Sequence, residues 1–291
     1  MNNNEIKALI SLLDDPDAEV VNEVTDNLTK KGPNIIPELE KAWDTTYNEV
    51  LQERLENVIH NIQLYFTGEN LKRWIRAGAE NILEGAFYIA QCQFPDISIN
   101  GINDEIDKIH KDVWLEINNN LTAFEKVKIL NYFMFDIYNY SINTIKTYSP
   151  QNYYINQVIK TKKGSPVTLS IIYLAVSRKL DLPISGLYCS KNLVLSYKDE
   201  HAINDDGNKF NDILFYINPN DNCAIIDKHE INSLISDQLI ENEVANKITC
   251  SNIDILIRLT QNLIHAYKMS GSNDTAVKFM ELLKILEQGL K

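Results

Sequence analysis

The fold is constrained above all by a change of pattern from Gly164 onward, where one strongly apolar helical segment is followed by short alternating runs separated by turn residues. Ser165 is a typical N-cap residue, and Pro166 suits the first helical position, where a missing amide hydrogen costs nothing. The residues that follow predict a helix to about Leu180. Four strands are predicted beyond it: Leu182–Tyr188, Leu193–Tyr197, Ile213–Ile217 and Cys223–Ile226, with a turn at Asp206-Gly207. The pattern indicates an antiparallel sheet packed against one helix.

The first sixty residues resemble themselves after a shift of thirty positions, which is typical of stacked helical units. The identical pairs include Leu9/Leu39, Asp14/Asp44, Glu19/Glu49, Val20/Val50, Glu23/Glu53 and Asn27/Asn57. Each unit is predicted to form two short helices, and the phrase Leu12–Val20, with its Asp/Pro turn, resembles a HEAT repeat. Because at least three such units are usually needed for independent stability, we expect residues 1–66 to dock on the next domain.

The remaining segments are predicted to be helical. After Thr67-Gly68 we expect a second helical stretch, with a helix over about Asn103–Asn119 and another from Thr122, whose capping box with Glu125 marks its start, to about Tyr140. A helix near His229–Ser236 precedes two closing helices, which are separated by Gly271. Asp274 is the predicted cap of the last one, and this pair resembles a tetratricopeptide-type unit.

The predicted fold class is therefore α+β and mainly helical. A HEAT-like array at 1–66 is followed by a domain at 67–248, in which a helical part (67–163) precedes the helix-plus-sheet core (164–236). A helix pair at 249–291 completes the chain.

Composition and charge exclude several classes of function. Against 28 Lys and Arg stand 40 Asp and Glu, so the formal net charge of −12 repels phosphate backbones and argues against nucleic-acid binding. The longest nearly apolar stretch, Leu169–Val176, is less than half of the roughly 20 residues that a membrane-spanning helix requires. The amino terminus has no basic, apolar leader, so we expect no export signal and a cytoplasmic protein.

The four cysteines give no metal motif or disulfide framework. They lie at Cys92, Cys189, Cys223 and Cys250, and their spacing fits neither a CxxC metal site nor a short disulfide-rich domain. We expect reduced thiols, no metal and no cofactor.

The segment Lys163–Ser170, continuing to Leu182-Pro183-Ile184, resembles the transglutaminase-like superfamily. Within the superfamily it more closely resembles the bacterial invasion-regulator (Sir-B type) branch, whose pattern is a Gly-x-Pro-[IV]-x-Leu helix start followed by a Gly-[IL]-Pro strand. The lead-in Asn152–Ile159 and the strand end Phe215–Pro219 also match this branch. The resemblance implies a helix-plus-sheet core of the papain-like kind, in which the active members use a Cys-His-Asp triad.

Carried over by this resemblance, the triad positions hold residues that cannot perform its chemistry. The nucleophile falls on Pro166, which has no thiol, and the general base on Asn192, whose amide cannot accept a proton near neutral pH. The orienting acid falls on Asn218. Because a nucleophile and its base act as one unit, we predict a pseudoenzyme.

Three functions remain open from the sequence. The first is protein or peptide binding in a regulatory or scaffolding role, with Ser165, Pro166, Cys189, Asn192 and Asn218 as candidate groove residues and an unidentified partner that is neither nucleic acid nor membrane. The second is a cysteine-dependent amide hydrolase or acyl transferase with a non-standard nucleophile, Cys189 or Ser165. The third is a small ligand bound between Asn192 and Asn218. The sequence predicts no oligomeric state.

Overall fold

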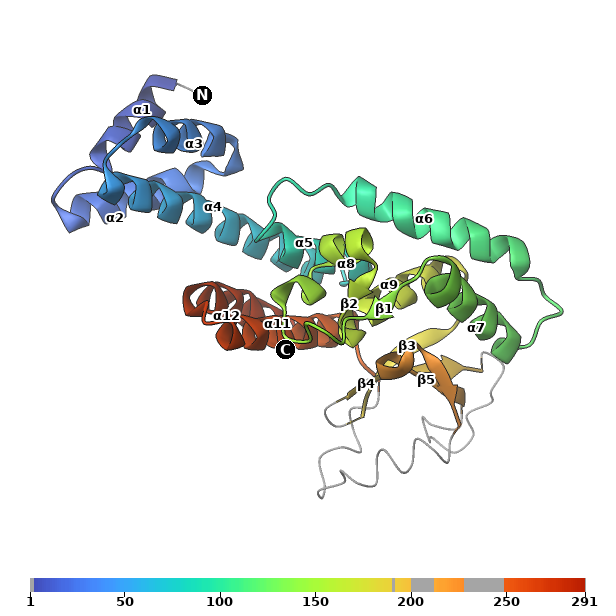
Figure 1. Ribbon diagram of the computed structural model, residues 1–291. Coiled ribbons are helices and arrows are strands. Elements are labelled where there is room, and N and C mark those ends of the chain that lie inside the picture. The colour runs from blue at the N-terminus through green and yellow to red at the C-terminus, as the bar shows by residue number, and fades with distance from the viewer. Residues whose placement is uncertain (1–2, 190–191, 200–211, 228–248, 291) are drawn as a thin grey trace, which may run out of the picture.

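The computed structural model describes residues 3–189, 192–199, 212–227 and 249–290 (Figure 1). The predicted turn at Asp206-Gly207 and the predicted helix at His229–Ser236 lie outside the described residues. No helix in the described part of the chain is long and apolar enough to cross a membrane.

Four helices build the amino-terminal part: α1 (Asn3–Leu12), α2 (Ala18–Lys31), α3 (Ile36–Thr45) and the first half of α4 (Glu49–Arg76), with a 3-10 turn, η1 (Pro33–Ile35), before α3. Asp17 caps α2 and Asn48 caps α4 through their side-chain oxygens. Leu28 and Val58, which coincide under the thirty-residue shift, are both buried in the small core that these helices share. Two helices per unit are thus observed, while the likeness to HEAT repeats stays a prediction.

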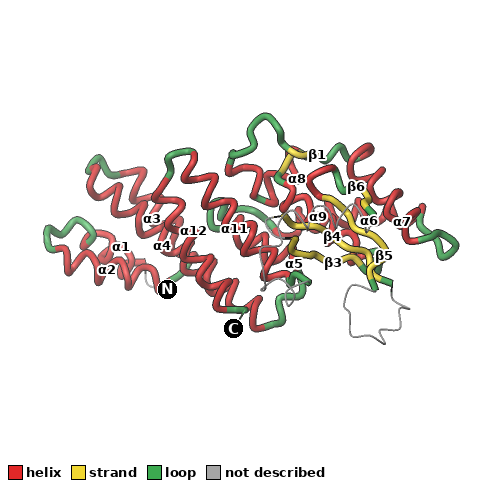
Figure 2. Tube along the Cα trace, turned by 90° about the horizontal axis from the view of Figure 1, so that it is seen from below, coloured by secondary structure: helices red, strands yellow, loops and turns green. Residues whose placement is uncertain are grey.

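Helix α4 connects this part to the rest of the molecule, as both views show (Figures 1 and 2). Its first half is buried with α1–α3 through Leu55, Val58 and Ile62, and its second half enters the main core through Leu71 and Trp74. The second helical stretch expected after Thr67-Gly68 does not begin there as a new helix, because Gly68 lies inside the continuous α4. A Cβ at Gly68 would lie 2.9 Å from Ile285 Cδ1, so this glycine permits the close approach of a later helix.

The main body contains α5 (Ile82–Gln91), α6 (Ile99–Glu116), α7 (Ala123–Asn131), α8 (Ile155–Thr161) and α9 (Pro166–Lys179), with the 3-10 turn η3 (Pro150–Tyr153) before α8. The predicted Thr122–Glu125 capping box is present at the start of α7. The helix predicted to reach Tyr140 instead changes after Asn131 into a π-helical turn, η2 (Tyr132–Ile137), in which the Tyr138 amide donates to the Phe133 carbonyl.

A four-stranded antiparallel sheet follows α9 in the order β3 (Ile184–Cys189), β4 (Asn192–Lys198), β5 (Ile213–Asn218), β6 (Ala224–Ile226), with η4 (Pro219–Asp221) between the last two. One face packs into the same core as α9 through Leu193, Leu195 and Ile217. The other face carries a separate small cluster of Leu187, Val194, Ile213, Tyr216 and Ile226. The predicted helix-against-sheet arrangement is therefore present. A two-residue parallel pair, β1 (Ser141–Ile142) with β2 (Lys163–Gly164), lies just before α9.

The closing helices are α11 (Asn252–Met269) and α12 (Asn273–Gln288). They pack on each other and share the core of α4, α5 and α9 (Figure 2). A chain of buried rings joins them to the body: Tyr267 stacks on Phe279 at 5.6 Å, and the Tyr267 and Tyr154 hydroxyls lie 2.7 Å apart. The predicted cap is wrong, because Asp274 lies in the first turn of α12 and Ser272 occupies the cap position.

Candidate functional site

The start of α9 is the position that the superfamily resemblance assigns to a nucleophile. Ser165 is the N-cap and Pro166 the first helical residue, as predicted. The buried Ser165 hydroxyl accepts from the Thr168 amide at 3.2 Å and lies 2.9 Å from the Thr168 hydroxyl. This hydroxyl is held in a local network, and no base is bonded to it in the part of the chain that the structure describes.

Asn152 fixes the start of α9 from the preceding segment. Its carbonyl accepts from the Ser165 amide at 3.0 Å and from the Thr168 hydroxyl at 2.8 Å. Its buried side chain donates to the Lys146 and Thr147 carbonyls and accepts from Asn143 Nδ2 at 2.9 Å. The sequence shows Asn152 within a family-like lead-in, but its positioning role depends on long-range contacts that no local pattern carries.

The other two candidate triad positions lie at one end of the sheet. Cys189 pairs with Asn192 at the β3–β4 connection, and the structure describes the backbone of both. Asn218 ends β5, where its Oδ1 accepts from the Asn220 amide at 3.0 Å and opens η4, which packs against α9.

The strand register places positions 192 and 218 in relation to α9. Position 192 has the same parity along β4 as Val194, and position 218 has the same parity along β5 as Tyr216. Val194 and Tyr216 belong to the cluster on the face away from α9. Positions 192 and 218 therefore lie at the same end of neighbouring strands, with the parity of the sheet face that is turned away from α9. Their convergence with Pro166 stays a prediction.

Two hydrogen bonds through Asn131 link the segment between η4 and β6 to the middle of α9. The Tyr173 hydroxyl donates to Asn131 Oδ1 at 2.8 Å, and Asn131 Nδ2 donates to the Cys223 carbonyl at 2.7 Å. Burial raises the pKa of the Tyr173 hydroxyl and of the Cys223 thiol well above their ordinary values, so both groups stay protonated. These two hydrogen bonds therefore hold α9 and the segment around Cys223 together, and the protonated Tyr173 and Cys223 groups supply no nucleophile.

The Cys92 thiol and clusters of metal-ligating side chains are two further candidates for a reactive site. Burial raises the pKa of the Cys92 thiol to about 12, which keeps it in the unreactive thiol form. Among the described residues, no three His, Cys, Asp or Glu side chains gather in a way that could hold a metal ion.

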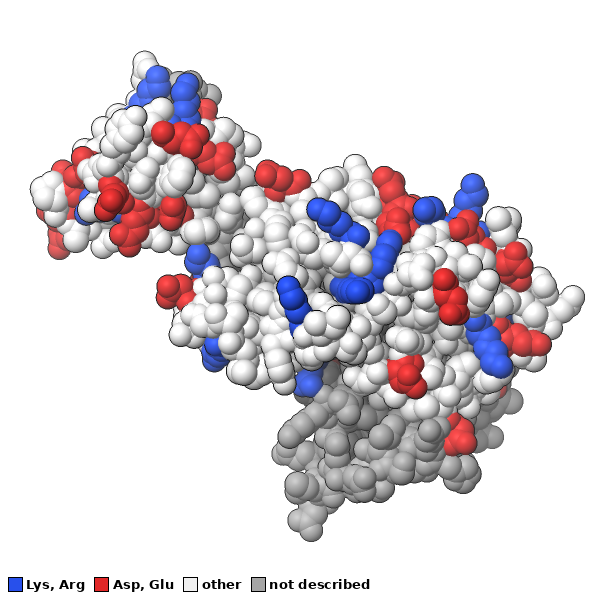
Figure 3. All heavy atoms as spheres, in the orientation of Figure 1, with Lys and Arg blue, Asp and Glu red and all other residues white. Residues whose placement is uncertain are grey.

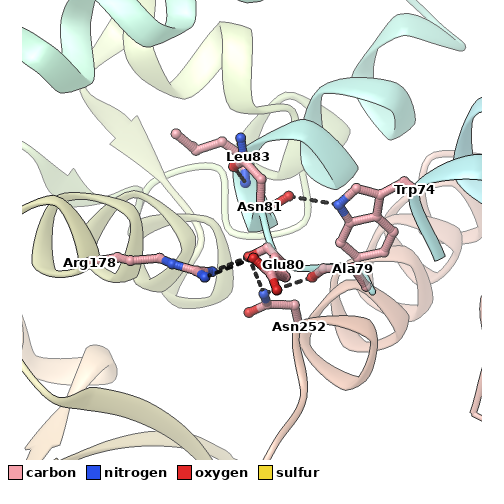
Figure 4. Close-up of polar contacts among 7 residues, drawn as sticks. All are labelled: Trp74, Ala79, Glu80, Asn81, Leu83, Arg178 and Asn252. Carbon is pink, nitrogen blue, oxygen red and sulfur yellow. Dashed lines mark hydrogen bonds and ion pairs between the residues drawn. The ribbon is translucent and has the colours of Figure 1, made fainter. Parts of the chain in front are cut away.

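The far end of α9 is tied to the body by a second polar cluster (Figure 4). Asn252 Nδ2 donates to the Ala79 and Glu80 carbonyls at 2.9 and 2.8 Å, and the Arg178 guanidinium donates to the Glu80 carbonyl. Trp74 Nε1 donates to the Asn81 carbonyl at 2.8 Å. This cluster connects the α4–α5 turn with α9 and α11.

Beside that cluster lies a cleft of about 260 Å³, with mostly apolar walls from α9, β3 and α11. Its polar lining includes Glu80, Arg178, Ser185 and the buried Cys250, whose amide donates to the Gly186 carbonyl at 2.8 Å. None of the residues carried over from the triad lines this cleft.

A helix held at its first turn, a sheet against it and polar residues at strand ends define the core of a transglutaminase-like protein. The family model for the transglutaminase-like superfamily matches residues 100–261, more than half of the chain. The chain belongs to this superfamily.

Curated relatives match only parts of the chain. A "UPF0162 protein" of Xylella fastidiosa is 27% identical over 106 residues, which cover 36% of this chain and 38% of the relative. F-box only protein 21 of Homo sapiens is 26% identical over 152 residues, or 44% of this chain and 24% of that protein, and the Mus musculus protein matches over the same shares. The chain therefore spans less than two fifths of the length of these relatives. No solved structure gives a significant match.

Proposed function

We propose that this chain is a non-catalytic member of its superfamily that binds a protein or peptide in a regulatory or scaffolding role. The observation that carries the proposal is the start of α9, where a proline ring takes the first helical position and the neighbouring Ser165 hydroxyl is committed to Thr168. A nucleophilic hydroxyl needs an adjacent base to take its proton, and within the described residues the Ser165 hydroxyl is bonded to Thr168 and to no base.

The proposal includes finer assignments within the family. We place the chain in the invasion-regulator (Sir-B type) branch on the strength of its Gly164–Leu169 and Asn218-Pro219 motifs. The amino-terminal helices are proposed as HEAT-like units and the α11–α12 pair as a tetratricopeptide-like unit, and both kinds of helical unit commonly serve as protein-binding surfaces. A cytoplasmic location is part of the same proposal.

The competing function is an amide hydrolase or acyl transferase that uses Cys189 or Ser165. The test is a screen of the full chain against amide and thioester substrates, with Cys189→Ala and Ser165→Ala as matched variants. We expect that any turnover detected is the same in the parent and in both variants. A turnover that either substitution abolishes would overturn the proposal.

Thiol reactivity gives an independent readout of the same question. Iodoacetamide labelling at neutral pH, followed site by site by mass spectrometry, compares Cys189 with a free-thiol peptide. The partly buried Cys92 and the buried Cys223, whose thiol pKa values are both raised, serve as slow internal standards. The non-catalytic proposal expects Cys189 to label no faster than the peptide. Labelling well above the peptide rate would indicate an activated thiolate and would favour the enzyme.

A further inference from the structure

A cleft of about 300 Å³ lies where the amino-terminal helices meet the main body, far from the start of α9 along the chain. Residues of α4 and α12 line its floor, and side chains of α2 and α12 flank it; α2 and α12 each pack on α4. Figure 3 shows the re-entrant corner between the two parts of the molecule. This volume is at the lower end of ligand pockets, which run to about 1,000 Å³, so it suits one long side chain better than a whole helix.

The floor of this α2/α4/α12 cleft is apolar. Leu64 and Tyr65 come from α4, and Leu282 and Ile285 from α12. The Tyr65 side chain is 50% exposed. Gly68 adds no side chain here, and Ile285 packs closely over it.

The flanks carry carboxylates from two different elements. Asp26 on α2 and Glu281 on α12 both line the cleft, and neither forms an ion pair within the described residues. The third carboxylate, Glu69, is bonded to Lys72 at 2.8 Å, and that bond holds its pKa below the ordinary value. The cleft lining therefore has one Glu–Lys ion pair and two carboxylates that form no ion pair within the described residues.

The wider surface has the same sign. Residues 1–66 hold thirteen Asp or Glu and five Lys or Arg, so their net charge of −8 makes up two thirds of the −12 of the whole chain. Acidic side chains are conspicuous on this part of the molecule in Figure 3. Such a field attracts a basic partner over a distance of roughly 10 Å at ordinary salt.

We propose that the α2/α4/α12 cleft binds an arginine side chain presented by a basic segment of a partner protein. The aliphatic part of an arginine fits the apolar floor along Tyr65, and its planar guanidinium can donate to carboxylates on both flanks. The inference names a partner class for the proposed binding role, and it concerns a surface other than the start of α9. An activity found at α9 would overturn the proposed function and leave this cleft unaffected.

The test is fluorescence polarisation of the full chain with a fluorescein-labelled octapeptide of alanine and leucine that carries two arginines. A second peptide carries citrulline, the uncharged isostere, in their place, and a third carries lysine. We expect the arginine peptide to bind at least tenfold more tightly than the citrulline peptide and severalfold more tightly than the lysine peptide. Equal affinity for the arginine and citrulline peptides, or no binding of the arginine peptide, would overturn the proposal.

Matched variants locate the binding. Asp26→Asn combined with Glu281→Gln is expected to weaken the arginine peptide at least tenfold. Glu40→Gln combined with Glu287→Gln removes the same charge from exposed positions outside the cleft lining and is expected to change the affinity less than twofold. Equal weakening by both pairs would show diffuse attraction and refute the cleft.

Tyr65→Ala tests the apolar part of the same site without changing charge. The ring is half exposed, so the variant is expected to fold, which a circular dichroism melt verifies. We expect severalfold weaker binding of the arginine peptide with an unchanged salt dependence. Undiminished binding would contradict the assigned floor.

Discussion

At the scale of single residues, the start of α9 is held by hydrogen bonds among Asn152, Ser165 and Thr168. Asn152 satisfies the Ser165 amide and the Thr168 hydroxyl with one carbonyl, and its own amide closes the 146–147 turn. Buried polar groups of this kind stabilise the fold only while every partner is present. When one partner is removed, the group left without it costs its full desolvation penalty. These contacts fix the first turn of α9 in place.

Asn152→Ala tests this position directly. The substitution leaves the Lys146 carbonyl and the Asn143 amide without their partner, so the free energy of unfolding should fall by about 1–3 kcal/mol. Asn120→Ala, at an exposed loop position, is the control and should stay within about 0.5 kcal/mol of the parent. Urea unfolding monitored by circular dichroism measures both. Equal stability of the two variants would show that the network contributes nothing.

His60 on α4 gives a pH-dependent prediction. Burial, with help from the nearby Lys278 charge, lowers its pKa below the ordinary 6.5. As the pH falls below 6.5, the unfolded chain takes up this proton before the folded chain does, so the free energy of unfolding decreases. His60→Gln should therefore lose less stability between pH 7 and pH 5 than the parent does. Urea titrations at both pH values measure this difference, and an identical loss in parent and variant would contradict it. The same substitution at His110 is the control.

At the scale of elements, the sequence predicts types and caps better than ends and continuity. The helix from Pro166, the sheet that follows it and the Ser165 and Thr122 caps are present as predicted, because capping chemistry and periodicity are local. The continuity of α4 through Gly68 was not predicted, because the reason for that glycine is the side chain of Ile285, more than two hundred residues away. The π-helical turn after Asn131 was missed for a similar reason, since no residue pattern signals it.

The same limit applies to the candidate site. Ser165, Pro166 and Asn218 lie at the element ends that the motifs predict. The role of Asn152 and the link through Asn131 to Cys223 depend on contacts between distant segments, and the last joins residues 92 positions apart. A single sequence contains these residues but not their proximity.

Glycines inside helices show how packing decides what an element tolerates. A Cβ at Gly85 on α5 would overlap Leu256 Cδ1 and lie 2.9 Å from Trp74 Cζ2, whereas a Cβ at Gly101 on α6 meets nothing within 4 Å. Gly85→Ala should therefore destabilise the protein by about 1–3 kcal/mol through overpacking. Gly101→Ala should stabilise it by about 0.5–1 kcal/mol, because alanine loses less backbone entropy in a helix. Thermal or urea unfolding of the pair measures the opposite signs, and equal shifts of the same sign would refute the packing argument.

At the scale of the whole molecule, α4 and the closing helices join parts that the sequence separates. The amino-terminal core and the main core are distinct clusters that α4 enters in turn. The pair α11–α12 lies within the main core, and the family match itself continues to residue 261, inside α11. The packed rings of Tyr154, Tyr267 and Phe279 are one physical link between this pair and the segment that leads into α9.

Phe279→Ala distinguishes a shared core from an independent helix pair. Phe279 is 1% exposed and contacts both tyrosine rings, so its loss should cost about 3–5 kcal/mol. If the core is shared, hydrogen exchange followed by mass spectrometry will show faster exchange in α9 and α5 as well as in α11 and α12, because these helices open together. Val277→Ala, at a 54% exposed position of the same helix, should leave every region protected. Faster exchange confined to α11 and α12 would instead show that the pair unfolds alone, and the start of α9 would then owe its position to the Asn152 network without support from the closing helices.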